Sequence, residues 1–533
     1  MDFLNVLIAY FYNLLYNKIN KKRVEIMNKK PLVLCILDGC GIREDADGNA
    51  FKNAYKPTFD MLTKKYPHSL LEASGEAVGL PPGQMGTSEV GHMNLGAGRV
   101  ALQPLEAISG SVRNGAFFKN VKILEVLNHV KNNNSNLHIF GLLSDGGVHS
   151  HIEHLFALLE MCKRNTISNV YLDICLDGRD TYEKSALSYL EKLDKKLKQL
   201  GIGKISTISG RYYGMDRDNN FDRLKLAYDA IVYGDAKEYN SFYDLIDDNY
   251  NNGVFDEFVK PGIINKCPLQ DNDGIITFNF RKDRLREMFT LLSNPNAYEN
   301  QAIEKGISVK HFSNLKTLTM YPVTETVKSP HAFDDLDLKN ILVDYLHDNH
   351  LSQLRIAETE KYPHVTFFFD GGKEIEYSDI KKILIPSPKV ATYDLKPEMS
   401  VYEVTDNFLK EVGNFDVTII NLANGDMVGH TGVYEAAKKA VEHMDICIKK
   451  MYEKVMELNG IMIIIADHGN CDVMWDQNHK PVTSHTTNPV PCIITKEGIE
   501  ITDGKLADIA PTMLELLGLP IPKEMTGRSL IKR

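Results

Sequence analysis

Three continuous apolar runs in the sequence each end at or near an acidic residue. The runs PLVLCILDG, VTIINLANGD and IMIIIADHG contain Asp38, Asp426 and Asp467 at or just beyond their ends. Apolar runs of this length without alternation predict strands buried on both faces, as in a parallel sheet. Ligands bind beyond the carboxyl ends of such strands. The pattern therefore predicts an α/β fold with functional acids at the edge of a sheet.

Between these runs, the spacing of apolar residues is helical. The segment 433–458 (VYEAAKKAVEHMDICIKKMYEKVMEL) predicts a helix that packs on the sheet. The middle of the chain has its own alternation of strands and helices and carries the arginine-rich motifs, whereas the acid and histidine motifs lie before about residue 100 and after about residue 420. A domain inserted into another produces this order. We predict an N-terminal extension (1–28), a core domain (29–101 and 336–533) and an insertion (102–335).

Length and charge narrow the class of function. A chain of 533 residues is too long for one hydrophobic core and favours several domains with a cleft between them. The net charge of -10 argues against nucleic acid as a partner, but it allows a small anionic substrate held by local arginines. The eight cysteines are scattered without a CxxC pair, which predicts a reducing, cytoplasmic location.

Residues 1–28 differ from the rest of the chain. An apolar, aromatic run from Phe3 to Tyr16 is followed by a basic segment from Lys18 to Arg23. The run is shorter than the roughly 20 residues that span a bilayer, and no small-residue cleavage site follows it. We expect an accessory or mis-assigned extension before Met27, and contact with a membrane only through these residues. A membrane-surface helix is the alternative.

Carboxylates and imidazoles cluster in the last quarter of the sequence and indicate metal binding. The motifs DMVGH, ADHGN and TSHTTNPVP contribute Asp426, His430, Asp467, His468 and His485, and Asp38 adds a sixth group. These groups suit divalent metals such as manganese or zinc, and they exceed what one tetrahedral ion needs. A single histidine would more often be structural, but the joint pattern predicts two ions.

Ser88 is a candidate nucleophile in the motif GQMGTSEVGHMN. A serine hydroxyl is a poor nucleophile at neutral pH, and coordination by a metal is one way to activate it. The alternative is a helix N-cap, because Ser followed by Glu-Val-Gly-His can open a helix. The two roles are compatible, since a helix N-terminus also binds a phosphoryl group.

Arginines recur beside glycine and aspartate in three central motifs. DGRDT, GRYYGMDRD and FNFRKDR contain Arg179, Arg211, Arg217, Arg281 and Arg284. Guanidinium groups bind carboxylate and phosphate oxygens in pairs, so together these residues could hold a small polyanion. A surface salt bridge is the commoner role of a single arginine. Their repeated position in loops favours binding.

Ten ordered motifs resemble one family, the cofactor-independent phosphoglycerate mutases of the alkaline phosphatase-like superfamily. They run from LDGCG and MGTSEVGHMNLGAGR through GLLSDGGVHSH, DGRDT and GRYYGMDRD to NGDMVGHTG and ADHGN, and cover the chain from about Lys30 onward. The resemblance implies an alkaline phosphatase-like core domain with an inserted α/β transferase domain. It also implies two Mn²⁺ ions per chain, no 2,3-bisphosphoglycerate and a monomer.

The resemblance also implies a role for each matching residue. One ion would be held by Asp426, His430 and His485, and the other by Asp38, Ser88, Asp467 and His468. Ser88, bound to metal, would accept the phosphoryl group of 3-phosphoglycerate and return it to the 2-hydroxyl to give 2-phosphoglycerate. Lys361 would reach the phosphate and Asp180 would carry protons. The glycerate would be bound by His149, Arg179, Asp180, Arg211, Arg217, Arg281 and Arg284.

Two alternatives are weaker. A phosphopentomutase or phosphatase of the same superfamily would share the metal motifs but lack the arginine motifs. A catalytically silent, membrane-associated protein would not need an intact Ser88 together with the six Asp and His groups. The chain departs from the expected family pattern at Thr87, Phe221 and Lys282, and none of these is a proposed ligand.

Overall fold

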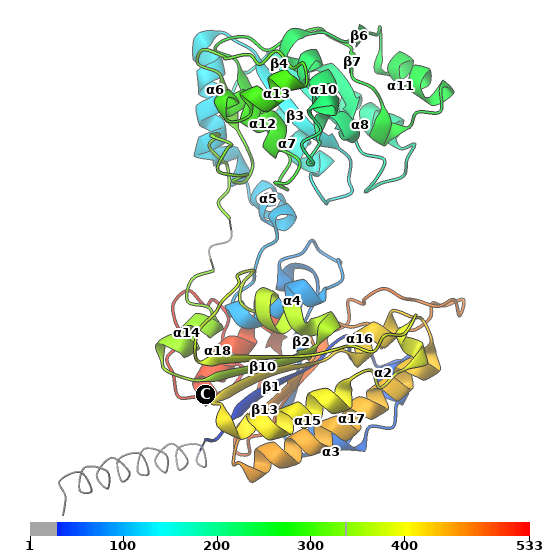
Figure 1. The fold of residues 1–533 in the computed structure, drawn as a ribbon, viewed down its shortest axis with the longest axis vertical. Helices are drawn as coiled ribbons and strands as arrows, with labels where there is room; N and C mark the ends of the chain where they lie inside the picture. The colour runs from blue at the N-terminus through cyan, green and yellow to red at the C-terminus, as the bar shows by residue number, and fades with distance from the viewer. Residues whose placement is uncertain (1–28, 336–337, 533) are drawn as a thin grey trace, which may run out of the picture. The chain divides into compact units, whose positions relative to one another are not determined.

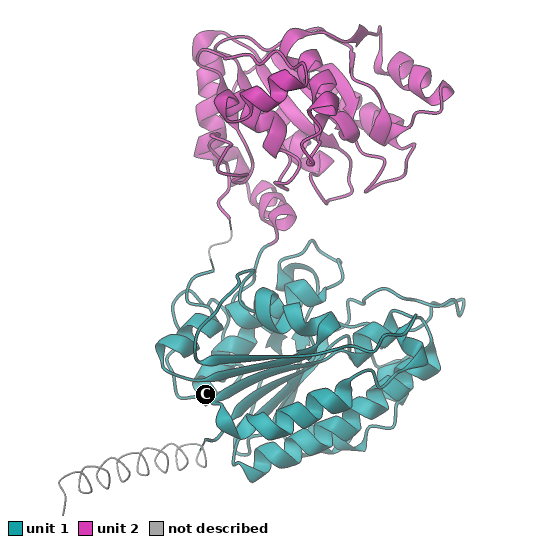
Figure 2. Ribbon diagram, viewed as in Figure 1, with its two compact units in different colours: residues 1–102, 338–533 teal, residues 103–337 magenta. Residues whose placement is uncertain are grey.

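The computed structural model describes residues 29–335 and 338–532, which form two compact units (Figures 1 and 2). Unit 1 comprises the described residues 29–102 and 338–532, and unit 2 comprises 103–335. The predicted extension 1–28, with its alternative of a membrane-surface helix, lies outside the described residues. The predicted domain boundaries stay a prediction. Within the described ranges, no helix has the length and apolar character that crossing a membrane requires.

Unit 1 is built on an eight-stranded sheet with the order β11-β10-β12-β1-β13-β14-β2-β15. The first five strands in this order are parallel to one another, and β14 runs antiparallel to β13 and to β2. The strands are β1 (Leu32–Leu37), β2 (His68–Glu72), β10 (Gln353–Glu358), β11 (Ile380–Ile385), β12 (Val417–Leu422), β13 (Ile461–Ile465), β14 (Val490–Ile494) and β15 (Gly504–Lys505). The three predicted apolar strands are therefore neighbours, with β1 between β12 and β13.

Helices cover both faces of this sheet because its central strands are apolar on both sides (Figure 1). One face carries α2 (Ala50–Asn53), α3 (Pro57–Lys65), α15 (Val401–Glu411) and α17 (Tyr434–Glu457), and the other carries α4 (Ser88–Ala97), α14 (Leu342–Asp348) and α18 (Ile509–Leu516). The short helix α16 (Asn424–Gly429) follows β12. Helix α17 coincides with the predicted helical segment 433–458.

Unit 2 contains a second sheet with the order β6-β7-β5-β4-β3-β8-β9, in which only β7 pairs antiparallel, with β5. Its strands are β3 (Leu137–Leu143), β4 (Val170–Leu176), β5 (Lys204–Gly210), β6 (Lys237–Glu238), β7 (Gly262–Ile263), β8 (Gly274–Thr277) and β9 (Lys316–Leu318). Its helices are α5 (Pro104–Arg113), α6 (Val121–Asn133), α7 (Ile152–Arg164), α8 (Ala186–Leu200), α9 (Arg211–Gly214), α10 (Phe221–Tyr233), α11 (Phe242–Asn251), α12 (Arg286–Ser293) and α13 (Glu299–Glu304).

Each face of the second sheet has its own apolar core. Helices α6, α7 and α8 pack with residues such as Ile139 and Leu172 on one face, and α10 and α12 pack with Phe140 and Ile275 on the other. Side chains that are neighbours along a strand point to opposite faces, so both cores draw on the same strands. The predicted α/β fold class is confirmed in both units.

Candidate active site

The carboxyl ends of β1, β12 and β13 bring together three acids that are far apart in the sequence. Asp38, Asp426 and Asp467 are all buried. Between them lies the ammonium group of Lys361, with Nζ 2.8 Å from Asp38 Oδ1 and 2.6 Å from Asp426 Oδ2. Gly39 permits this convergence: it has a φ of +74°, and a Cβ there would lie 2.6 Å from the Asp426 Cα.

Ser88 lies at the start of α4 and points its hydroxyl into this group. Its Oγ is 2.6 Å from Lys361 Nζ, 2.9 Å from His468 Nε2 and 3.2 Å from Asp38 Oδ1. The alternative of an N-cap at Ser88 is wrong, because Thr87 has the extended backbone of an N-cap and its side chain accepts from the Val90 N–H. Thr87 thus leaves the Ser88 hydroxyl free for the site.

The orientation of three histidines suits metal binding. The Nδ1 atoms of His430, His468 and His485 lie 2.7, 3.2 and 2.8 Å from backbone carbonyl oxygens, so each ring carries its proton on Nδ1 and turns Nε2 inward. The Nε2 atoms of His430 and His485 are 3.1 Å apart, and each is 3.1 Å from Asp426 Oδ1. Lone pairs that converge in this way fit a cation between them.

Two groups of described residues have the spacing of a metal site. The first is Asp426, His468 and His485, and the second is Asp38, His92 and Asp467. No role was predicted for His92 from the sequence. The predicted ligand sets, which include His430 and Ser88, stay predictions.

His92 is fully buried, one helical turn after Ser88 on α4. Its Nδ1 is 2.8 Å from the Ser88 carbonyl oxygen and 3.2 Å from Asp467 Oδ2, and its Nε2 is 3.0 Å from Asn421 Nδ2. Asn421 in turn donates to Asp38 Oδ2 at 2.7 Å. The i, i+4 spacing from Ser88 was a signal in the sequence that could have identified His92.

The charged groups of the site shift one another's pKa values. Burial lowers the pKa of Lys361, but the carboxylates of Asp38, Asp426 and Asp467 outweigh it and raise that pKa above its usual range. Burial raises the pKa of Asp467, but His468, His92 and Lys361 together hold it well below its usual range. Asp467 Oδ2 is buried and accepts no hydrogen bond, although His92 Nδ1 lies 3.2 Å away. An ionised oxygen without a donor is suited to a metal ion.

A second cluster of charge lies within unit 2, at the carboxyl ends of β4 and β5. The buried Arg211 pairs through Nη1 with Asp177 at 2.7 Å and with Asp180 at 2.6 Å. The remaining predicted binding residues lie close to it. Arg179 donates its backbone N–H to Asp177 at 3.2 Å and pairs through its side chain with Glu257 at 3.5 Å. The others interact with Arg211 or with Asp283: His149, Arg217, Arg281 and Arg284.

Asp283 also belongs to this cluster, although no role was predicted for it from the sequence. It lies 3.1 Å from Arg217 Nη1, 3.0 Å from Arg281 Nε and 3.7 Å from His149 Nδ1. It lies within the motif FNFRKDR, but its position in that motif does not indicate its role. Burial and the charge of Arg211 lower the pKa of His149 to about 4, which keeps this imidazole neutral at pH 7.

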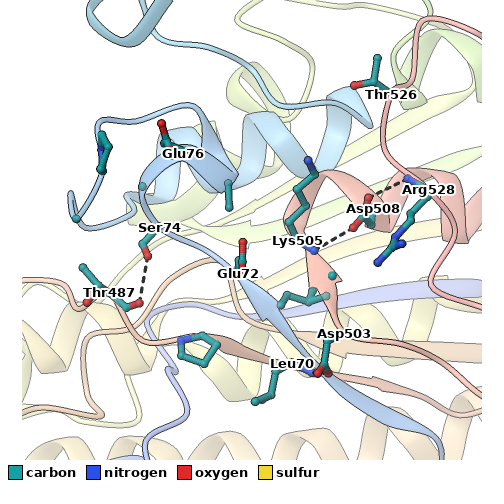
Figure 3. A pocket seen from close by; sticks show the side chains of 17 residues that line it. Leu70, Glu72, Ser74, Glu76, Thr487, Asp503, Lys505, Asp508, Thr526 and Arg528 are labelled. Carbon is teal, nitrogen blue, oxygen red and sulfur yellow. Dashed lines mark hydrogen bonds between the residues drawn. The ribbon is translucent and has the colours of Figure 1, made fainter. Parts of the chain in front are cut away.

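One cavity in unit 1 lies apart from these residues, along β2 and β15 (Figure 3). Its volume is about 970 Å³, and its lining includes Glu72, Asp503, Lys505 and Arg528. Asp508 in its wall accepts from the backbone N–H groups of Lys505 and Arg528 at 3.0 and 2.8 Å. None of the predicted site residues lines this cavity, so it does not belong to the candidate active site.

The sequence comparisons agree with this geometry. Residues 30–521 match the family model described as the Metalloenzyme superfamily, so the chain belongs to that superfamily. The chain is 48% identical over 511 residues to the 2,3-bisphosphoglycerate-independent phosphoglycerate mutase of Staphylococcus epidermidis, a match that covers 95% of this chain and 100% of the relative. The chain therefore belongs to the family of 2,3-bisphosphoglycerate-independent phosphoglycerate mutases, which confirms the predicted resemblance.

A solved structure supports the fold over nearly the whole chain. It is the phosphoglycerate mutase of Leishmania mexicana at low cobalt concentration, with a TM-score of 0.59 and 28% sequence identity. The match covers 95% of this chain and 98% of that chain. Both units are thus included in the similarity.

Proposed function

We propose that this protein interconverts 3-phosphoglycerate and 2-phosphoglycerate through a phosphoserine at Ser88, without 2,3-bisphosphoglycerate. The observation that carries the proposal is the position of the Ser88 hydroxyl, within 3.2 Å of Lys361 Nζ, His468 Nε2 and Asp38 Oδ1 in a buried polar site. No other arrangement in the described residues surrounds a serine hydroxyl with so many charged groups. Membership of the mutase family gives the substrate class.

The acids and imidazoles of unit 1 would hold two divalent cations, which we propose to be Mn²⁺. The residues in question are Asp38, Ser88, Asp426, His430, Asp467, His468 and His485, with His92 next to them. When bound, the cations would stabilise the alkoxide of Ser88 and neutralise charge on the transferring phosphoryl group. Mixed carboxylate and imidazole donors suit Mn²⁺, and they also suit other first-row divalent ions.

The chain's own groups prepare Ser88 for transfer. Lys361 Nζ lies 2.6 Å from the serine Oγ, so it can hold an oxygen of the phosphoryl group next to the nucleophile. Ser88 is the first residue of α4, so the positive end of the helix dipole faces the same position. Both features stabilise negative charge where the phosphoserine forms.

Unit 2 would bind the glycerate. Arg179, Arg211, Arg217, Arg281 and Arg284 would hold its carboxylate and phosphate, and the neutral His149 would hydrogen-bond to it. Asp180, paired with Arg211 at 2.6 Å, would carry the proton between the two glycerate hydroxyls. We also propose a cytoplasmic monomer that binds no nucleic acid. This is consistent with the net charge of -10 and the eight free cysteines.

The test uses the purified full chain with 3-phosphoglycerate and Mn²⁺, and without 2,3-bisphosphoglycerate. Formation of 2-phosphoglycerate is expected. Ser88→Ala should abolish it, whereas Ser188→Ala, an exposed serine on α8, should retain the wild-type rate. A rate for Ser88→Ala above one tenth of wild type would refute the phosphoserine. Release of inorganic phosphate without 2-phosphoglycerate would indicate a phosphatase instead.

The arginine assignment has its own test. Arg284 is 8% exposed and donates through Nη1 to the Met215 carbonyl oxygen at 2.9 Å, which leaves other guanidinium donors for a ligand. Arg284→Ala should raise KM for 3-phosphoglycerate, with a smaller effect on kcat. An unchanged KM would show that Arg284 does not bind substrate.

A further inference from the structure

Cys267 differs from every other cysteine of the chain. All eight cysteines lie in the described part of the sequence, and seven of them are buried, whereas Cys267 is half-buried. Burial raises the pKa of Cys162, Cys175 and Cys492 to about 12 each, so these thiols are protonated and unreactive at neutral pH. A reagent for thiols therefore meets Cys267 first.

Behind Cys267 lies a buried row of three polar groups in unit 2. The Cys267 Sγ is 3.9 Å from His138 Nε2, and His138 Nδ1 is 2.8 Å from Asp173 Oδ2. The other oxygen of Asp173 accepts from the Thr207 hydroxyl at 2.8 Å. His138 and Asp173 are 0% and 1% exposed. The order hydroxyl, carboxylate, imidazole and thiol is that of an activated nucleophile with its base and its orienting acid.

An irregularity in the sheet creates this arrangement. The register between β4 and β5 shifts at Leu172/Asp173, so that Asp173 pairs with Thr207 and Ser206 is the extra residue. The Ser206 carbonyl oxygen accepts from the N–H groups of Ile264 and Asn265 at 2.8 and 3.3 Å. These bonds fix the segment that leads to Cys267.

The chain is fixed after Cys267 as well. The buried Leu269 donates its N–H to the Ile231 carbonyl oxygen at 3.1 Å. Cys267 is thus anchored on both sides, and its position beside His138 is a property of the fold and not of a mobile loop.

The electrostatics of the row favour a positively charged His138. Burial lowers the pKa of His138, but the charge and hydrogen bond of Asp173 outweigh it and raise that pKa to about 10. Tyr171 stacks on the imidazole with ring centroids 5.8 Å apart, and its own hydroxyl interacts with Cys267 and with Asp273. The imidazole thus places a positive charge 3.9 Å from the sulfur that is to act as the nucleophile.

We propose that Cys267, activated by His138 and Asp173, is a site of thiol–disulfide exchange with a low-molecular-weight disulfide such as oxidised glutathione. The Cys267 thiolate attacks one sulfur of the disulfide. A bond forms between Cys267 Sγ and that sulfur while the original S–S bond breaks, and the other half leaves as a thiolate that takes a proton from water. The product is a mixed disulfide at Cys267.

Access to the sulfur rests on the partial exposure of Cys267. The nearby cavity of about 500 Å³ is lined by Tyr171, Ile264 and Asn265 and not by Cys267 itself. None of the residues proposed for mutase chemistry belongs to this row, so the exchange is independent of the proposed function.

The experiment uses the full chain, oxidised glutathione and iodoacetamide at pH 7, with peptide mass spectrometry to locate the modification. We expect one glutathione at Cys267, and none in Cys267→Ser. The alkylation rate of Cys267 should fall at least tenfold in His138→Gln and in Asp173→Asn. Thr207→Val, which removes only the outermost hydroxyl, should lower it less. Equal rates in wild type and in folded His138→Gln would overturn the proposal.

The wild-type protein alone gives a second test, in case a buried variant fails to fold. Unfolding in urea removes His138 from the neighbourhood of Cys267. If His138 activates the thiol, iodoacetamide at pH 7 should alkylate Cys267 faster in the folded protein than in the unfolded chain. An equal or slower rate in the folded protein would refute activation by His138.

Discussion

Substitution of Arg211 tests whether the charge cluster of unit 2 stabilises that unit as well as binding the substrate. Its side chain is 1% exposed, and its Nη1 contacts Asp177 at 2.7 Å and Asp180 at 2.6 Å. In Arg211→Met the buried Asp177 loses its only charged partner among the described residues and keeps only the neutral donors around it. Removal of one member of a buried ion pair costs about 3–5 kcal/mol. We expect a loss of this size in the free energy of unfolding of unit 2.

The assay separates the two units. The single tryptophan of the chain, Trp475, lies in unit 1, so its fluorescence reports on that unit, while far-UV circular dichroism reports on both. In urea, Arg211→Met should lower the midpoint of the dichroism transition and leave the Trp475 transition in place. Adding Asp177→Asn should recover part of the loss, because the unpaired charge is then absent.

Arg281→Met is the matched control. Its side chain is 47% exposed and pairs with Asp283 at 3.0 Å, and an ion pair with that exposure contributes about 0–1 kcal/mol. Both variants should raise KM for 3-phosphoglycerate, but only Arg211→Met should destabilise the protein. A loss below about 1 kcal/mol in Arg211→Met, or equal losses in the two variants, would refute the assignment of Arg211 as a buried, structurally required cation.

Three further predictions concern a buried acid, a glycine contact and the metals. Burial, with the charge of Asp216, raises the pKa of Glu287 from 4.5 to about 7. The protonated carboxyl therefore stabilises the folded state, and this contribution is complete below pH 4.5 and is lost as pH rises through 7. The side chain of Glu287→Gln stays neutral at all pH values. The free energy of unfolding of the variant minus that of wild type should therefore increase by on the order of 2–3 kcal/mol between pH 4.5 and pH 8. A difference that stays constant with pH in urea titrations would contradict this. Gly96→Ala should lower the thermal midpoint of the Trp475 transition by several degrees, because a Cβ at Gly96 would overlap the Phe369 carbonyl oxygen; an unchanged midpoint would show that the helix shifts freely. Chelation of divalent metal should stop the mutase reaction and Mn²⁺ should restore it, so full activity after exhaustive chelation and dialysis would rule out a catalytic metal.

The local pattern of the sequence predicted those features of unit 1 that are determined by residues close together in the chain, namely its central strands and the acids that follow them. Continuous apolar runs predicted β1, β12 and β13, and the acids after them were expected at one edge of a sheet. This worked because a strand buried on both faces must be apolar throughout, and because parallel strands end at the same edge. The family motifs then allowed roles to be predicted for Ser88, Lys361 and the arginines.

Other features of the site could not be predicted, since they depend on which segments meet in space. His92 and Asp283 lie within recognised motifs of the sequence. Their places in the site depend on contacts with Asp467 and Arg217, which are more than sixty residues away in each case. Thr87 and Ser88 are both suitable N-cap residues, and only the structure shows that the extended backbone and the capping hydrogen bond are at Thr87.

The row behind Cys267 shows most clearly the difference between what the sequence predicts and what only the tertiary structure determines. Sequence alone determined two α/β units, the acids at the strand ends and the family to which the chain belongs, because local periodicity and ordered motifs encode these. Only the tertiary structure placed Cys267 beside His138, which is 129 residues away, through a one-residue irregularity between β4 and β5. Such a contact depends on the register of the sheet and on the path of the connecting chain, and neither can be predicted from the local pattern of residues.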